Sequence, residues 1–365
     1  MSKIERIVMI APHFEEYAFL LARALARHAN VLLILDTKQL NDDFTGRLRP
    51  EAPGVTLRHS AFQGPLELAR ILQAIVRFRP QVLHWQEPSG LIKAVMAATT
   101  ITLATPFTRT ALTIHDAVPH SGRDATVAQR LAPVRRFARW RAQRLFLHGG
   151  LCREQYLREY LPAPHRDDRV RLTEHGTILV GEPAEQPAGA GSGFSALMFG
   201  RMEAYKGLDV LLAAAQDLAA QGVQFQLDLA GSGPELERLA PEFAALSGVR
   251  IEQGYVSSAR LIEKMQAADC VVLPYLSATQ SGVLAAAMGN GRFVIASRVG
   301  GIPDLVQHGE NGLLVEPGDA GGLAQALRSV ATDEALRQRL REGARQTAAK
   351  RLSWDRIADQ MMLDY

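Results

Sequence analysis

Two basic side chains, Arg201 and Lys206, are separated by four residues at a point where a strand is expected to end and a helix to begin. The apolar run 195–199 predicts a buried strand, and Gly200 and Gly207 bracket the turn that follows it. A guanidinium and an ammonium group at one strand end suit a ligand with several negative charges, such as a diphosphate. The pair therefore predicts a phosphate site.

A second turn further along the chain supplies the other half of this site. It follows an expected strand at 271–273 and Pro274, and a helix is expected to open at Gly282, Val283 and Leu284. The first turn of a helix presents N–H groups without intrahelical partners and a partial positive charge, so it attracts phosphate. We expect a diphosphate to lie between this helix start and the two cations.

Histidines lie at the ends of three expected strands in the first half of the chain. His115, with Asp116 beside it, follows 110–114, His13 follows 6–10, and His84 ends 82–84. The carboxyl ends of parallel strands meet at one edge of a sheet, where α/β proteins bind ligands. A histidine at such an end can also serve only as a polar cover of the sheet, so both interpretations stay open here.

Length and composition bound the class of protein. The chain has 365 residues, 47% hydrophobic and 22% charged, which predicts two domains with separate cores. Cys152 and Cys270 lack metal-binding spacing and indicate a reducing compartment and no metal. The first apolar stretch is too short for a secretory signal, and no apolar run reaches the about 20 residues that span a bilayer. We expect a cytoplasmic protein, and the net charge of +3 is too mild to indicate a nucleic-acid partner.

Strand and helix patterns alternate along the whole chain, which predicts an α/β fold with doubly wound parallel sheets. A stretch rich in Pro, Gly, Ala and Ser interrupts the alternation near the middle and is the expected linker. The predicted organisation is a Rossmann-like domain at 1–180, a linker at 181–193, a second Rossmann-like domain at 194–350, and a helix at 351–365 that could cross back to the first domain. The two domains are expected to face each other across a cleft.

An arginine-rich segment, 123–144, predicts an amphipathic helix, because its apolar residues recur at helical spacing. In one interpretation the helix covers the sheet and its arginines are solvated. In the other, the arginines contact an anionic membrane surface or a pyrophosphate-linked acceptor. The membrane hypothesis rests on Arg130, Arg135, Arg136 and Arg139.

The second half of the chain resembles a known family. The motifs FGRMEAYKGLDVLL, LAGSGPELERL, IEQGYVSSARLIEKMQAADCVVLPY and SGVLAAAMGNGRFVIASRVGGIPDLVQHGENGLLVEPGD look like successive motifs of the retaining glycosyltransferases of family 4, which have the two-domain GT-B fold. The resemblance covers nearly all of residues 194–365. In the first half it is thinner and rests on RPQVLHWQEP, LTIHDAVPH and LTEHGTIL.

This resemblance implies a nucleotide-diphosphate-sugar donor in the C-terminal domain, an acceptor at the N-terminal domain, and neither a metal nor another cofactor. Arg201 and Lys206 match the family's diphosphate ligands, and His115 matches a histidine near the reacting sugar, with Asp116 next to it. The implied donor residues further include Gly200, Gly207, Tyr255, Val256, Gln280, Ser281, Gly282, Val283 and Leu284, with Tyr255 and Val256 at the base. The candidate acceptor-side residues are His13, Glu15, Glu16 and His84.

The chain departs from the family at its usual pair of glutamates. An ungapped match places Ala278 at the first position and Ala286 at the second, so the usual ribose contact is missing. Gln280 and Ser281 are the candidates to contact the sugar instead.

The leading hypothesis is a retaining, metal-independent hexosyltransferase that acts on a saccharide or lipid-linked acceptor in bacterial polysaccharide synthesis. The missing glutamates motivate a second hypothesis, a sugar-nucleotide-binding module without catalytic activity. A third is a sugar-nucleotide epimerase of the same architecture.

Overall fold

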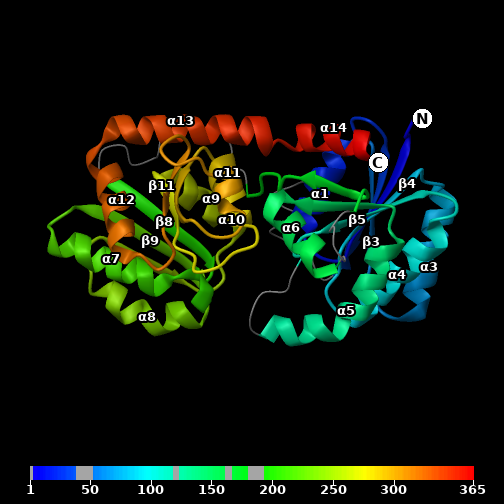
Figure 1. Ribbon diagram of the computed structural model, residues 1–365, viewed down its shortest axis with the longest axis horizontal. Coiled ribbons are helices and arrows are strands. Elements are labelled where there is room, and N and C mark those ends of the chain that lie inside the picture. The colour runs from blue at the N-terminus through cyan, green and yellow to red at the C-terminus, as the bar shows by residue number, and fades with distance from the viewer. Residues whose placement is uncertain (1–2, 38–51, 118–122, 161–166, 180–192) are drawn as a thin grey trace. The chain divides into compact units, whose positions relative to one another are not determined.

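The computed structural model describes residues 3–37, 52–117, 123–160, 167–179 and 193–365, with the side chains of 123–130 left out. The chain forms two compact units, residues 1–176 with 354–365, and residues 177–353. Each unit contains one parallel sheet flanked by helices (Figure 1), which confirms the predicted fold class. The predicted linker, 181–193, lies outside the described residues except for Gly193.

The sheet of the first unit has, within the described ranges, seven parallel strands in the order β3-β2-β1-β4-β5-β6-β7. The strands are β1 (Arg6–Ala11), β2 (Asn30–Asp36), β3 (Val55–Ser60), β4 (Val82–Gln86), β5 (Arg109–Ile114), β6 (Arg144–His148) and β7 (Val170–Thr173). The inner strands are buried along nearly their whole length, as expected for a parallel sheet covered on both faces.

The helices of the first unit come from the N-terminal half of the chain and, in the case of α14, from its C-terminal end. They are α1 (Glu15–Leu25), α3 (Gly64–Phe78), α4 (Leu91–Ala104), α5 (Arg123–Arg141), α6 (Gly149–Tyr160) and α14 (Trp354–Asp364). Helix α14, at the end of the chain, packs on α1 (Figure 1) and buries Trp354, Ile357 and Met361. Helices α4 and α5 pack against each other.

The sheet of the second unit has six parallel strands in the described chain, in the order β10-β9-β8-β11-β12-β13. The strands are β8 (Phe194–Arg201), β9 (Phe225–Ser232), β10 (Val249–Gln253), β11 (Cys270–Leu273), β12 (Phe293–Ser297) and β13 (Gly312–Val315). The helices are η2 (Ala204–Lys206), α7 (Leu208–Ala220), α8 (Pro234–Ala244), α9 (Ser258–Ala267), α10 (Gly282–Gly289), α11 (Ile302–Leu305), α12 (Ala320–Thr332) and α13 (Glu334–Arg351). Helix α7 packs beside α8 and α12, and α10 packs beside α13.

The strand order of the second unit reverses at β8. The chain leaves β8 for β9 on one side, whereas β11 pairs with β8 on the other. Loops that leave neighbouring strands in opposite directions open a crevice at the carboxyl ends, where such sheets bind ligands. Both predicted phosphate-binding segments leave the sheet at this point.

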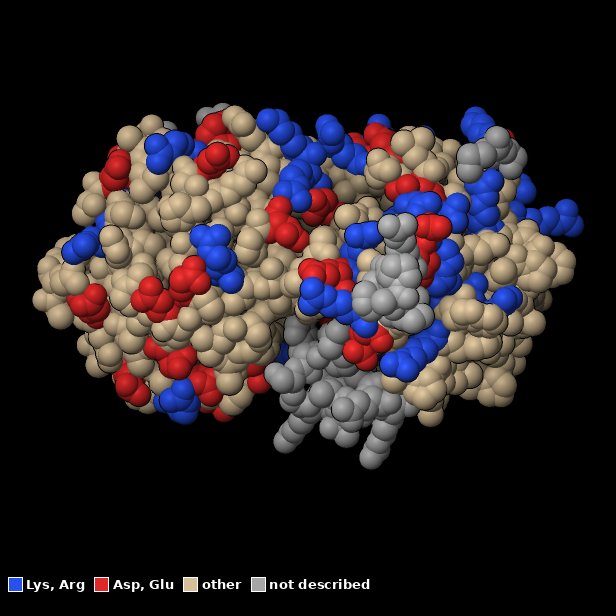
Figure 2. All heavy atoms as spheres, viewed as in Figure 1, with Lys and Arg blue, Asp and Glu red and all other residues tan. Residues whose placement is uncertain are grey.

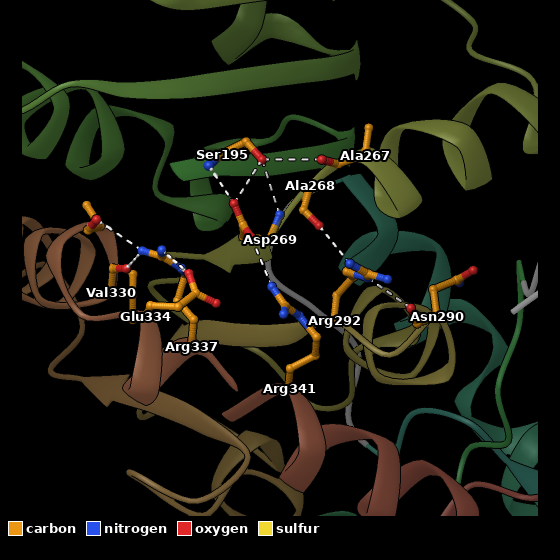
Figure 3. A network of polar contacts seen from close by, with 11 residues as sticks. Ser195, Ala267, Ala268, Asp269, Asn290, Arg292, Val330, Glu334, Arg337 and Arg341 are labelled. Atoms are coloured by element: carbon orange, nitrogen blue, oxygen red, sulfur yellow. Dashed lines mark hydrogen bonds and ion pairs between the residues drawn. The ribbon is translucent and has the colours of Figure 1, made fainter. Parts of the chain in front are cut away.

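A polar network lies at the amino ends of the strands of the same sheet, opposite their carboxyl ends (Figure 3). Asp269 accepts hydrogen bonds from the Ser195 backbone N–H at 2.9 Å and from Arg341 at 3.0 Å. Arg292, which is fully buried, donates to the Ala268 carbonyl at 3.2 Å, and burial lowers its pKa to about 10, with Arg341 and Arg345 adding to the effect. The network ties β8, β11, β12 and α13 together far from the carboxyl ends of the strands.

Candidate functional site

Lys206 lies at the turn between β8 and α7 and is held by a tyrosine from the loop after β11, the strand that neighbours β8 in the sheet. Its Nζ donates a hydrogen bond to Tyr275 Oη at 2.7 Å and lies 3.9 Å from the centre of the Tyr275 ring. Burial and, to a smaller extent, the nearby charge of Arg201 lower the pKa of Lys206 to about 8. An anion in contact with this lysine would stabilise its charged form.

Arg201, the last residue of β8, has a side chain that is 65% exposed. Its Nε is 3.7 Å from a carboxylate oxygen of Glu203, which is a long, exposed ion pair of little energetic value. The guanidinium is therefore available to an incoming ligand at the carboxyl end of β8.

Two contacts fix the loop after β11 against the loop after β8. The φ of Gly207 is +67°, and a Cβ at this position would lie 1.9 Å from the Pro274 carbonyl oxygen, so only glycine fits. The Leu276 N–H donates to the Tyr205 carbonyl at 2.8 Å. The structure thus brings Arg201, Lys206 and the loop before α10 together within one unit.

Ser281 begins α10 as its N-cap. The Ser281 hydroxyl accepts a hydrogen bond from the Leu284 N–H at 3.2 Å, as is typical of an N-cap serine. Gly282 and Val283 form the first turn, which contains no acidic residue. Gln280 precedes the cap, and its amide packs so close to Gly301 that a Cβ there would lie 2.6 Å from Gln280 Nε2.

The two alanines at the glutamate positions have different surroundings. Ala286 is fully buried among the core residues of the second unit, whereas Ala278 is partly buried and its carbonyl oxygen lies against Gly300. The Ala286 position is therefore part of the core packing and offers no polar group. Tyr255, after β10, is 80% exposed, and its neighbour Val256 packs against the core.

In the first unit, His115 follows β5 in a cluster of aromatic rings. Its Nε2 donates to the side-chain oxygen of Gln86 at 2.9 Å, and its ring centre lies 4.1 Å from that of Phe14 and 5.0 Å from that of Tyr17. Burial lowers the pKa of His115 to about 3, and the nearby His175, His84 and His13 contribute to this decrease. The imidazole is therefore neutral near pH 7, and the partly buried Asp116 follows it.

The other acceptor-side candidates at the start of α1 are only partly buried. His13 Nε2 lies 2.8 Å from the Ser89 hydroxyl, which joins the loops after β1 and β4, and burial lowers the pKa of His13. Burial also raises the pKa of Glu15, to which the charge of Glu16 contributes. These three side chains remain accessible to a ligand of the first unit.

His84 is not accessible, and the prediction of an acceptor contact for it is wrong. Its side chain is fully buried, with Nδ1 2.6 Å from Tyr365 Oη and Nε2 2.7 Å from Thr113 Oγ1. Burial lowers its pKa to about 3. His84 instead anchors the last residue of the chain in the first unit.

The membrane hypothesis also needs a correction, because two of its four arginines are turned inward. Arg139 is 3% exposed and makes a bidentate ion pair with Glu87 at 2.7 and 2.8 Å, and Arg135 binds the same carboxylate at 2.6 Å. Burial alone would raise the pKa of Glu87, but the two arginines hold it below its usual value. The side chain of Arg130 lies outside the described residues.

The solvent-exposed face of α5 carries other residues. Arg136 is 57% exposed, and Phe137 and Trp140 are 45% and 65% exposed with ring centres 5.8 Å apart. On the described part of the face drawn in Figure 2, acidic and basic side chains are interspersed over both units. No helix among the described residues is long and apolar enough to cross a membrane.

Sequence reasoning missed three residues that organise these sites. Gln86 is the last residue of β4 and Glu87 follows it, and Tyr275 follows β11 directly after Pro274. Each lies at or just after the carboxyl end of a buried strand, and this position could have marked them as candidate site residues. Their partners are more than 25 residues away in the sequence, so spacing alone could not reveal the contacts.

Comparisons with known sequences agree with the motifs of the second unit. Residues 193–333 match the family model described as Glycosyl transferases group 1. A D-inositol 3-phosphate glycosyltransferase of Xylanimonas cellulosilytica is 34% identical over 170 residues, 46% of this chain and 40% of that protein. A sulfoquinovosyl transferase of Arabidopsis thaliana is 26% identical over 308 residues, 78% of this chain and 57% of that protein. The chain thus spans less than two thirds of the length of these relatives.

Solved structures match over the whole chain. The Anabaena protein HepE in complex with UDP has a TM-score of 0.73 at 18% identity, with 98% of each chain covered. A sucrose-phosphate synthase from Thermosynechococcus elongatus has a TM-score of 0.70 at 22% identity, with 98% of this chain and 97% of that chain covered. At these identities the likeness shows the fold, which is the two-unit architecture of the GT-B glycosyltransferases.

Proposed function

The family model and the relatives support assignment of this chain to the glycosyl transferases group 1 family, and from this premise we propose that it is a retaining glycosyltransferase. It transfers a hexose from a nucleoside-diphosphate sugar to an acceptor hydroxyl. The observation that carries the proposal is the placement of Arg201 and Lys206 beside the capped start of α10. HepE was solved with UDP and with UDP-glucose, so uridine diphosphate is the first nucleotide to test.

The diphosphate gains negative charge as its bond to the sugar breaks. Arg201, Lys206 and the first N–H groups of α10 interact most strongly with the leaving group when that charge is fully developed, which lowers the barrier. These groups occupy the role that a divalent metal has in other transferases, so the reaction proceeds without one. Gln280 and Ser281 contact the sugar, and Tyr255 and Val256 contact the base.

His115 orients the sugar or the acceptor and does not act as a base. Its low pKa keeps the imidazole neutral, and its Nε2 is already hydrogen-bonded to Gln86. The bond between the anomeric carbon and the phosphate oxygen breaks, the acceptor oxygen bonds to the same face of that carbon, and the departing phosphate oxygen takes the acceptor proton. This balance requires no protein base, and it retains the anomeric configuration.

The first unit receives the acceptor, for which a lipid-linked saccharide of bacterial polysaccharide synthesis is the proposed class. His13, Glu15 and Glu16 provide partly buried polar groups beside the β1 and β4 ends. The exposed Arg136 and Trp140 of α5 suit the interface of an anionic membrane, because arginine is attracted to the headgroups and tryptophan prefers the interfacial layer. The proposed peripheral membrane contact therefore uses this exposed face of α5 and not Arg135 and Arg139, which are paired with Glu87.

The alternative is a sugar-nucleotide-binding module without turnover, which the two alanines favour. Ala286 leaves the ribose without its usual carboxylate partner, and this alanine is buried in the core of the second unit and offers no polar group. Such a module would bind the nucleotide through Arg201 and Lys206 and would release no product.

Turnover separates the two functions. A panel of nucleoside diphosphates in a thermal-shift assay first identifies the base, since a ligand at about 100 times its dissociation constant adds about 2.7 kcal/mol of stability. Nucleotide release from the matching sugar nucleotide is then measured with and without lipid-linked acceptors, in EDTA. Release that is lost in Arg201→Ala and retained in Arg238→Ala, an exposed arginine of α8 in the same unit, supports the transferase. Binding without release supports the module, and an altered sugar nucleotide would indicate an epimerase.

A further inference from the structure

Tyr275 occupies a position that links both halves of the donor site. Its side chain is 2% exposed, and its hydroxyl accepts the hydrogen bond from Lys206 Nζ at 2.7 Å. The same hydroxyl is hydrogen-bonded to Ser281, whose own oxygen caps α10. A chain of contacts therefore runs from the β8 turn through Tyr275 to the start of α10.

The ring of Tyr275 adds a second interaction with the lysine. The ammonium nitrogen lies 3.9 Å from the ring centre of Tyr275, compared with 5.3 Å from that of Tyr205. A cation this close to an aromatic face is attracted to it, and the attraction is larger where water is excluded. Tyr275 thus contacts Lys206 with both its face and its hydroxyl.

We propose that Tyr275 is a positioning residue that holds the Lys206 ammonium at the donor site and supports its positive charge. The inference rests on the proposed function, because it assigns Lys206 to the diphosphate. Tyr275 does not itself contact the reacting atoms, and it acts through the lysine.

The electrostatic surroundings of Lys206 make such support necessary. Burial and the charge of Arg201 lower its pKa to about 8, and the partly exposed Glu203 carboxylate lies 3.7 Å from Arg201 Nε. Tyr205 contributes a neutral ring, and the first turn of α10 contributes no acidic side chain. The Tyr275 hydroxyl accepts a hydrogen bond from Lys206 and therefore favours the charged lysine in the absence of a ligand. Removal of this hydroxyl is expected to lower the pKa of Lys206 further.

The test compares the pH dependence of UDP binding in wild-type protein, Tyr275→Phe and the control Tyr205→Phe, by titration calorimetry from pH 6.5 to 9.5. If the hydroxyl is worth about one pKa unit, Tyr275→Phe binds UDP about eightfold more weakly at pH 8.5 and less than about twofold more weakly at pH 6.5. Tyr205→Phe keeps the wild-type curve. A contact that is merely structural would weaken binding equally at every pH.

A second measurement does not depend on the nucleotide. Acylation of Lys206 by an amine reagent, followed by peptide mass spectrometry, reports the pH at which the neutral amine appears, and this pH is expected to fall in Tyr275→Phe. An unchanged acylation profile together with superimposable UDP curves would overturn the role of Tyr275 while the donor site stands. Failure of the wild-type protein to bind any nucleoside diphosphate would overturn the donor site and the inference with it.

Discussion

One arginine in each unit illustrates how differently two basic residues can be used. Arg139 of the first unit and Arg201 of the second were both selected from the sequence as ligand-binding cations, yet the side chain of Arg139 is 3% exposed and that of Arg201 is 65% exposed. Arg139 is neutralised by Glu87, which lies 52 residues earlier in the chain. Whether a cation serves the fold or a ligand depends on such a distant partner, which spacing does not show.

The two units also differ in their number of histidines. Nine of the ten histidines of the sequence precede residue 177, and only His308 lies in the second unit. His84 and His115 are buried and neutral, and they stabilise the first unit through hydrogen bonds to Tyr365 and Gln86. In the proposed donor site of the second unit, the candidate ligand-binding groups are instead the exposed Arg201, the half-buried Lys206 and the backbone N–H groups that open α10.

The largest effect is expected for Glu87→Ala, which leaves the buried Arg139 and the partly buried Arg135 without their carboxylate. Removing one partner of a buried ion pair costs about 3–5 kcal/mol, so the first unit should unfold at a much lower urea concentration. All three tryptophans, Trp85, Trp140 and Trp354, belong to this unit, and their fluorescence therefore reports its unfolding.

The matched control for this change is Glu154→Ala, which removes an exposed carboxylate paired with Arg158 on α6. It is expected to cost less than about 1 kcal/mol. Equal unfolding midpoints for the two variants would contradict the distinction between structural and ligand-binding cations.

The next effect concerns Lys206→Ala in the second unit. Loss of a group that stabilises developing charge lowers kcat by about 100-fold or more, whereas affinity for the free nucleotide falls less. The folding of the first unit should not change, and tryptophan fluorescence in urea provides that control. A loss of affinity with unchanged turnover would show that Lys206 binds ground state and transition state equally.

Acidification is expected to weaken the first unit selectively. The pKa values of His84 and His115 are about 3 in the folded chain and about 6.5 in the unfolded chain. Between these values the unfolded chain binds more protons, so stability is full above pH 6.5 and falls as the pH decreases, by up to about 1.4 kcal/mol per histidine per pH unit.

Hydrogen exchange at pH 7.5 and 5.5, corrected for intrinsic rates, measures this loss separately in peptides of each unit. His84→Gln should reduce the pH slope of the first unit by about one proton. Equal destabilisation of both units would count against a special role of the buried histidines.

The smallest effect is expected on the surface of α5. Arg136→Gln and Trp140→Ser together should reduce sedimentation with anionic vesicles, because each arginine near such a surface contributes about 1 kcal/mol and is screened by salt. Nucleotide affinity should stay unchanged. Arg158→Gln, which removes an arginine with a 73% exposed side chain on α6, is the control. Vesicle binding that is insensitive to salt, or equal in all three proteins, would leave α5 as an ordinary solvated helix.

The fold was largely predictable because buried parallel strands are continuous apolar runs. The strands expected at 195–199 and 271–273 agree with β8 and β11 within a few residues, whereas β3 and β7 of the first unit were not expected. Both are edge strands: Val55–Ser60 consists of partly buried and exposed residues up to the buried Ser60 and ends in polar ones, and Val170–Thr173 has only four residues. Weak periodicity at a sheet edge explains the omission.

The site was predictable only where local sequence determines it. Gly207, Lys206 and Ser281 belong to turns and caps whose chemistry is visible within a few residues. Tyr275 and Glu87 act through contacts with residues far along the chain, and only the assembled sheet brings them to their partners.

The central claim is that the second unit binds a nucleoside diphosphate through Arg201 and Lys206. Titration calorimetry of UDP, ADP and GDP in EDTA, with the wild-type protein and the double variant Arg201→Ala, Lys206→Ala, tests it most directly. We expect at least one of these nucleotides to bind the wild-type protein, and the double variant to bind it at least about 100-fold more weakly, since two charge-assisted contacts are lost. Absence of binding to the wild-type protein, or equal affinity in the folded double variant, would contradict the claim.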